Sequence, residues 1–99
     1  MFSHSFLGTN DIEKSRAFYT PVLGALGHAA VPLPHGTLFP SEAGSLIVAK
    51  PANGETHTVS NGHTLGFRAK SSAEVDAFHA AGIANGGTCE GKPGVRDRK

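Results

Sequence analysis

The stretch HSFLGTNDIEKSRAFY, residues 4–19, combines a short strand pattern, a turn and the start of a helix. The apolar, β-prone run starts at residue 2 and ends at the turn-forming pair Asn10-Asp11. The side-chain oxygen of either residue of this pair can cap a helix, because it can accept a hydrogen bond from a free backbone N–H. The sequence therefore predicts a strand over residues 2–8 and a helix from about Ile12.

The apolar residues that follow recur with the 3.6-residue period of a helix and define one face. Thr20-Pro21 interrupts the pattern, because Thr20 can act as a new cap and Pro21 suits the first position of a helix. We therefore expect a break there, a short second turn and an end at Gly27. The residues of the predicted face are Ile12, Tyr19, Val22, Leu23 and Leu26.

Residues 28–51 have the pattern of three short strands, HAAVPL, TLFP and SLIVAK, separated by PHG and SEAG, which are typical of turns. The polar stretch that follows offers almost nothing to bury. We therefore interpret residues 1–51 as a first β-α-β-β-β unit and residues 52–62 as a linker.

After the linker, the pattern of a strand followed by a capped helix occurs a second time. GHTLGFRA is a second strand pattern led by His63, and Ser71 with Glu74 forms a capping box before another helix pattern. Two segments of the helix patterns also resemble each other: residues 16–27, RAFYTPVLGALG, and residues 76–87, DAFHAAGIANGG. The sequence predicts an α+β fold of paired βαβββ modules, in which residues 63–99 form an incomplete second module. About two strands are missing from it, and TCEG at residue 88 would begin another strand, so we expect a C-terminally truncated chain.

The composition excludes several classes of protein. Ninety-nine residues with 38% hydrophobic and 17% charged content are typical of one folded globular domain. The net charge of +1 and the absence of a basic stripe argue against nucleic acid as a partner. No apolar run approaches the length needed to cross a membrane. The single cysteine excludes an internal disulfide and favours the cytoplasm, and Cys89 is expected to be an inert thiol.

His4 and His63 each lead the first strand pattern of a unit, so they can face each other across the sheet. Imidazole nitrogen binds divalent zinc, nickel, manganese or iron. SLIVAK, however, supplies no carboxylate to complete such a site. The alternative is a pocket lined by these histidines without a metal. Surface or boundary positions are expected for the other histidines, which are His28, His35, His57 and His79.

Two blocks of the sequence resemble the vicinal oxygen chelate superfamily. The first is HSFLGTNDIEKSRAFY with PVLGALG, and the second is NGHTLGFRAKSSAEVDAFHAAGIANGG. This superfamily includes glyoxalase I, fosfomycin-resistance and bleomycin-resistance proteins and extradiol dioxygenases. The resemblance implies paired βαβββ modules curled around a pocket, often completed in a dimer, and metal ligands at His4 and His63. The first ligand carboxylate of the relatives would lie near Val48 or Ala49. The arginine that binds glutathione in glyoxalase I would lie at Gly8, which argues against that activity.

The sequence thus leaves three functions open. The first is a glyoxalase-like small-molecule protein, acting as a divalent-metal-dependent lyase or dioxygenase with His4 and His63 as metal ligands. The second is a metal-free binder of the bleomycin-resistance type, and the third is an inactive truncated module. In the first two, we expect a small-molecule ligand in a pocket lined by His4, His63 and the substrate-binding residues Phe6, Phe39 and Phe67, in a homodimer.

Overall fold

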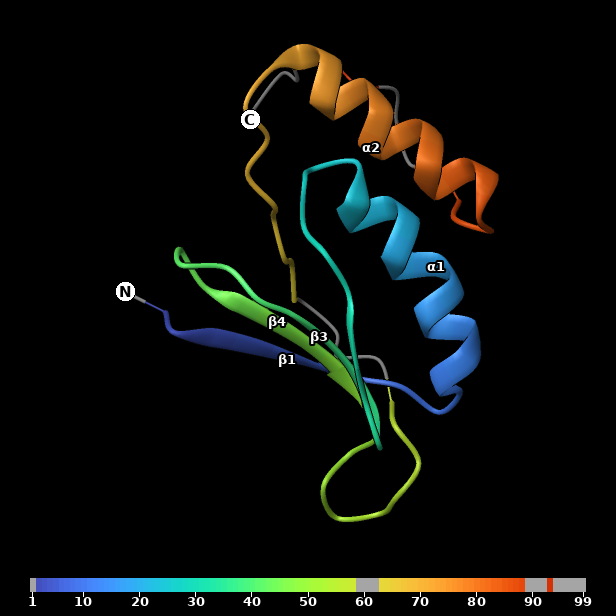
Figure 1. The fold of residues 1–99 in the computed structure, drawn as a ribbon. Coiled ribbons are helices and arrows are strands. Elements are labelled where there is room, and N and C mark those ends of the chain that lie inside the picture. The colour runs from blue at the N-terminus through green and yellow to red at the C-terminus, as the bar shows by residue number, and fades with distance from the viewer. Residues whose placement is uncertain (1, 59–62, 89–92, 94–99) are drawn as a thin grey trace.

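The computed structural model describes residues 2–58, 63–88 and 93. Within these ranges the chain forms one four-stranded sheet and two helices (Figure 1), which confirms the α+β prediction. The sheet order is β1-β4-β3-β2, with β1 parallel to β4 and the other neighbours antiparallel. The elements, in chain order, are β1 (His4–Gly8), α1 (Ile12–Gly24), β2 (Val31–Leu33), β3 (Gly36–Phe39), β4 (Ser45–Ala49) and α2 (Ser72–Ala84).

The core lies between α1 and one face of the sheet. Leu23 lies at the centre of this core and is 1% exposed. Because side chains alternate between the two faces of a strand, every second residue of β3 and β4 points into the core. The opposite side of the sheet carries His4, Phe6 and Gly8 of β1, and we call it the open face. The core cluster consists of Leu23, Leu26, Phe39, Leu46 and Val48.

The ends of α1 agree with the predicted signals. Of the two candidate caps, Asp11 is the one used, since its side chain accepts a hydrogen bond from the Lys14 backbone N–H at 3.0 Å. At the other end Gly27 has a φ of 88°, which a glycine adopts without strain. The His28 N–H can therefore donate to the Leu23 carbonyl at 3.0 Å and close the helix end.

The predicted break at Thr20-Pro21 is wrong, because α1 runs through Pro21 without interruption. A proline inside a helix removes one backbone N–H, and the carbonyl four residues earlier, that of Ala17, then lacks its usual donor. Ala17 is exposed, so water can reach this side of the helix. Val22 and Leu23, which follow directly, are both buried, and Leu23 belongs to the core cluster. Packing of the apolar face thus outweighs the cost of the proline.

The second helix matches the first in length, with 13 residues each. Ser71 caps it, since its hydroxyl accepts from the Glu74 N–H at 3.2 Å, as the capping box predicts. α2 packs against α1, and Phe78 packs against the core cluster, yet in the part of the chain described no residue of α2 is fully buried. Across those ranges, neither helix is long and apolar enough to cross a membrane.

The strand predicted from His63 is not formed within the described ranges. Residues 63–69 pair with no described strand, although burial alternates along them and Leu65, Phe67 and Ala69 pack against the core cluster. A strand requires a partner for its backbone groups, and no described segment supplies one here. The strand predicted from TCEG lies outside the described residues apart from Thr88.

Candidate functional site

A cavity of about 520 Å³ opens beside the amino-terminal ends of β1 and β4. β1 contributes His4 and Ser5, and the register pairs His4 with Ser45 and Ser5 with Leu46 on β4. The segment before α2 forms another wall. The large apolar side chains that line this amino-terminal cavity are Phe2, Leu26, Leu46, Leu65 and Phe67.

The same cavity carries more basic than acidic groups. Arg68 and Lys70 lie on the segment before α2, and their positive charges outnumber the single carboxylate of Glu74. That carboxylate is already engaged, because it accepts a hydrogen bond from the Lys70 backbone N–H at 2.7 Å. His4 and His28 add two imidazoles to the lining. The cavity thus combines an apolar wall with an excess of positive charge.

Of the five predicted pocket residues, His4 and Phe67 line this cavity, and Phe67 also borders a smaller cavity with Phe39. Phe6 points to the open face and is 50% exposed. Phe39 is buried in the core cluster and borders a small cavity of about 40 Å³ there. His63 is exposed and does not line the amino-terminal cavity.

The donors needed for a metal ion are only partly present. The Ser3 hydroxyl and the Nδ1 atom of His4 are 2.8 Å apart, and such a contact can orient an imidazole and leave Nε2 available as a ligand. β4 supplies no carboxylate beside it, since the Cα partner of His4 is Ser45. Within residues 2–58, 63–88 and 93, no three histidine, cysteine or acidic side chains form a group that could hold a metal. The described residues alone therefore do not complete a metal site.

The ring of His57 lies against strand β1. His57 belongs to the polar stretch after β4, yet it is half-buried, and its ring lies against Gly8. A Cβ on Gly8 would stand only 2.9 Å from Cγ of this ring, so a side chain at position 8 would displace it. Because Gly8 shares the open face with Phe6, the His57 imidazole lies on that face as well. His57 therefore occupies a boundary position, one of the two kinds of position expected for it, although its contact with Gly8 was not predicted.

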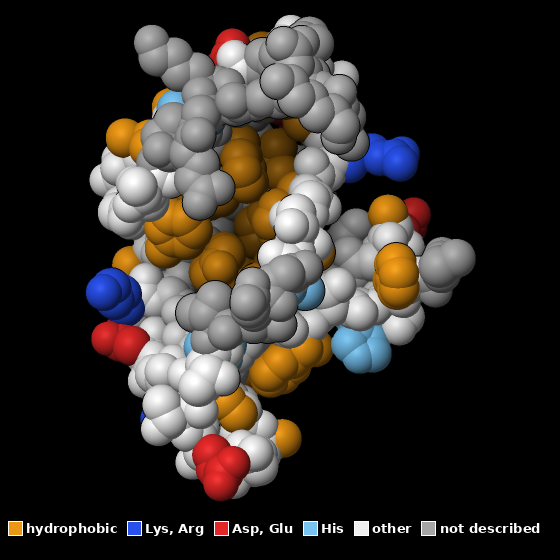
Figure 2. Space-filling view, turned by 180° about the vertical axis from the view of Figure 1, so that it is seen from behind, with side chains coloured by type: hydrophobic (Ala, Val, Ile, Leu, Met, Phe, Trp, Pro, Cys, Tyr) orange, Lys and Arg blue, Asp and Glu red, His pale blue; other side chains and the backbone are white. Residues whose placement is uncertain are grey.

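A second, more apolar cavity of about 470 Å³ lies between α1 and α2. Tyr19, Val22 and Phe67 form part of its lining, with Phe78 from α2, whose ring centroid lies 5.9 Å from that of Phe67. Figure 2 shows hydrophobic side chains gathered in a hollow on the rear of the molecule. Burial raises the pKa of the Tyr19 hydroxyl above its ordinary value, because the charged form is poorly solvated there.

Comparison with known proteins identifies the family. A model of the Glyoxalase/Bleomycin resistance protein/Dioxygenase superfamily matches residues 2–98. The chain belongs to this superfamily. A crystal structure of a glyoxalase/bleomycin resistance protein from Albidiferax ferrireducens T118 is similar, with a TM-score of 0.91 and 49% sequence identity over 98% of this chain and 80% of that chain. No curated protein matches.

Superfamily membership confirms the resemblance and the fold class inferred from the two motif blocks. The basic lining of the cavity and the contact between His57 and Gly8 were not predicted from the sequence. Arg68 and Lys70 could have been found, because they alternate with Phe67 and Ala69 along one extended segment. Nothing near His57 in the sequence indicates its contact with Gly8, which depends on how the chain folds back after β4.

Proposed function

We propose that this member of the superfamily binds a small organic acid with an apolar body in the amino-terminal cavity. The observation that carries the proposal is the lining itself, in which aromatic side chains stand beside an excess of positive charge. Phe67 supplies an apolar surface, and Arg68 supplies a planar guanidinium that can bind a carboxylate through two hydrogen bonds. A ligand pocket of this kind is mostly apolar, with a few polar groups that orient the ligand.

Calorimetric titration with aromatic carboxylates and their uncharged amides tests this function. We expect the acids to bind with micromolar dissociation constants and the amides to bind more weakly. Arg68→Gln should reduce the affinity for the acid roughly tenfold and leave the amide unaffected, as for the loss of one charge-assisted hydrogen bond. Lys50→Gln is the matched control, since Lys50 is exposed and does not line the cavity. Equal binding of acid and amide would refute the proposal.

A second candidate function is that of a divalent-metal-dependent lyase or dioxygenase with His4 and His63 as ligands. The contact between the Ser3 hydroxyl and Nδ1 of His4 favours it, because it leaves the other ring nitrogen available to an ion. A divalent ion would act there as a Lewis acid that polarises substrate oxygens. The described residues offer no carboxylate for the set, so we derive no reaction step from it.

Metal analysis of the purified protein separates this candidate from the metal-free binder. A metal enzyme should contain zinc, nickel, manganese or iron in stoichiometric amount, and His4→Ala and His63→Ala should each lose it. His35→Ala is the control, because His35 is an exposed turn residue. A protein that takes up no stoichiometric ion when these metals are supplied would rule the candidate out.

A further inference from the structure

The cavity of about 470 Å³ between α1 and α2, which we call the interhelical cavity, is a second place where a ligand can enter the molecule. We propose that it binds a small uncharged aromatic ketone, whose carbonyl oxygen accepts a hydrogen bond from the Tyr19 hydroxyl. Among the described residues, Phe67 is the one that lines both this cavity and the amino-terminal cavity. Arg68 and Lys70, which provide the positive charge of the amino-terminal cavity, do not line the interhelical one, so the two sites differ in chemistry.

Aromatic side chains form much of the wall of the interhelical cavity. Phe18 and Tyr19 of α1 meet edge to face, with ring centroids 5.0 Å apart. Phe67 and Phe78 are tilted by 49°, and their centroids are 5.9 Å apart. Such rings favour a further aromatic ring, which can pack against a face or an edge.

The lining also selects against charge. None of the described residues that line the interhelical cavity is an aspartate, glutamate, lysine or arginine. A charged ligand would lose water there without gaining an opposite charge, which is costly. The wall therefore favours an uncharged ligand, in contrast to the acid proposed for the amino-terminal cavity.

The Tyr19 hydroxyl is the polar group that can orient the ligand. The Tyr19 side chain is half-buried and packs against the core cluster, and its hydroxyl makes no hydrogen bond to any described residue. Burial raises the pKa of this hydroxyl, so it stays protonated at neutral pH and remains a donor. A carbonyl oxygen in the cavity would supply the acceptor that this donor lacks.

Gly82 leaves open space in the wall that α2 contributes. A Cβ at Gly82 would meet no atom within 4 Å, although α2 packs against α1. Val75 and Ile83, which also line the cavity, remain 40% and 46% exposed. The volume of about 470 Å³ lies within the range of roughly 300–1,000 Å³ that is typical of small-molecule sites. A ligand with a single ring can therefore fit between the two helices.

The test uses Tyr19 as the reporter, because it is the single tyrosine of the chain and gives one set of ring signals. The full chain with ¹³C-labelled tyrosine is titrated by NMR with acetophenone and with α-methylstyrene, which has the same shape but carries CH₂ in place of the carbonyl oxygen. We expect saturating shifts with acetophenone and roughly tenfold weaker binding of α-methylstyrene, as for the loss of one hydrogen bond. Ring signals that do not move with acetophenone, or equal affinities for both compounds, would overturn the proposal.

Two variants test the hydroxyl and the open space by calorimetric titration. Tyr19→Phe keeps the ring and should remove the preference for acetophenone. Gly82→Leu fills the space beside α1 and should weaken the binding of both compounds at least tenfold. Gly24→Leu is the matched control, because Gly24 also lies in a helix and its Cβ would meet no atom within 4 Å, but it does not line the cavity. Both leucines favour a helix, so the fold should persist. Unchanged affinity in Gly82→Leu would contradict the assignment.

Arg68→Gln separates this site from the one under the proposed function. The Tyr19 signals should respond to acetophenone in this variant as they do in the wild-type protein, whereas the affinity for aromatic carboxylates falls. If Arg68→Gln abolished the response of Tyr19, acetophenone would be bound in the amino-terminal cavity and the interhelical site would be refuted. Failure of the carboxylates to bind would refute the proposed function and leave the response of Tyr19 unchanged.

Discussion

Leu23→Ala is expected to reduce the free energy of unfolding by about 2–5 kcal/mol, because it removes the most buried side chain at the centre of the core and leaves a cavity. Leu23 is 1% exposed, and it belongs to the cluster with Phe39 and Val48 on the facing strands. Domains of this size have total stabilities of about 5–15 kcal/mol, so the loss is a large fraction of the whole. Urea denaturation followed by circular dichroism measures it.

Ile83→Ala is the matched control for this variant. It removes a comparable aliphatic side chain from a helix, but Ile83 is 46% exposed and α2 buries no residue. We expect a loss of less than about 1 kcal/mol, as for other exposed positions. If both variants were equally destabilised, the described core would not be the centre of stability, and α2 would have to pack more closely than the structure shows.

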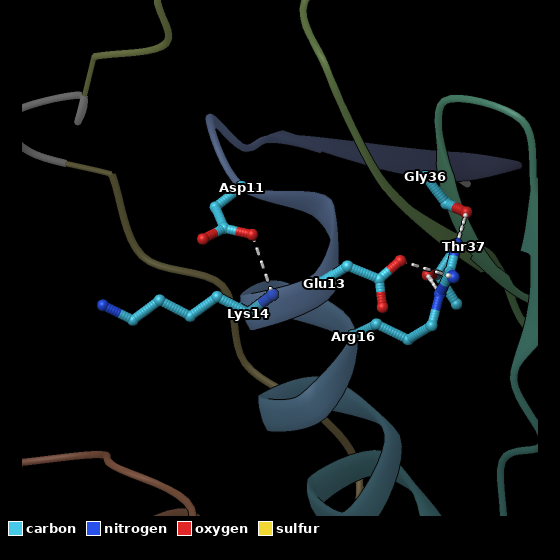
Figure 3. A network of polar contacts seen from close by, with 6 residues as sticks. All are labelled: Asp11, Glu13, Lys14, Arg16, Gly36 and Thr37. Carbon is cyan, nitrogen blue, oxygen red and sulfur yellow. Dashed lines mark hydrogen bonds and ion pairs between the residues drawn. The ribbon is translucent and has the colours of Figure 1, made fainter.

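Arg16→Met is expected to reduce the free energy of unfolding by roughly 1.5–3 kcal/mol, the range for hydrogen bonds that involve a charged group. Figure 3 shows the Arg16 guanidinium reaching from α1 to β3. Nη2 donates to the Gly36 carbonyl at 2.8 Å, and Nε donates to the Thr37 hydroxyl at 3.0 Å. Thr37 is buried, so its hydroxyl would lose a partner that water cannot easily replace. Chemical denaturation of the variant measures the loss.

Two further variants show which contact of Arg16 matters. Glu13 lies 3.4 Å from the guanidinium, but its side chain is 85% exposed, so Glu13→Gln should change stability by less than about 0.5 kcal/mol. Arg16→Lys keeps the charge but cannot bond Gly36 and Thr37 with the same planar fork, and we expect it to lose stability as well. A large effect of Glu13→Gln would show instead that the ion pair dominates.

Local sequence signals predicted the capped starts of both helices, because a cap depends on residues only three positions apart. Asp11 bonds the N–H of Lys14, and Ser71 bonds that of Glu74. Gly27 ended the first helix for a similarly local reason. The signal failed at Pro21, where the burial of Val22 and Leu23 outweighs a local preference for a break.

Contacts between distant residues could not be predicted in this way. Phe39 is an aromatic residue of the kind that lines pockets. It pairs with Leu46, however, and its side chain lies in the core. His4 and Phe67 do line one cavity, whereas Phe6, which lies on the same face of β1 as His4, does not. A shift of one residue along a strand changes the face of every side chain, so site membership depends on register.

The sequence by itself determined the α+β class, the two capped helices and the superfamily, because these depend on periodicity and on motifs that are continuous in the chain. The tertiary structure alone decided which side chains meet. It placed β1 beside β4, joined Arg16 to β3 and brought His57 onto Gly8 through the side chain of Asn10. These contacts join residues twenty or more positions apart, and only the folded backbone determines their distances.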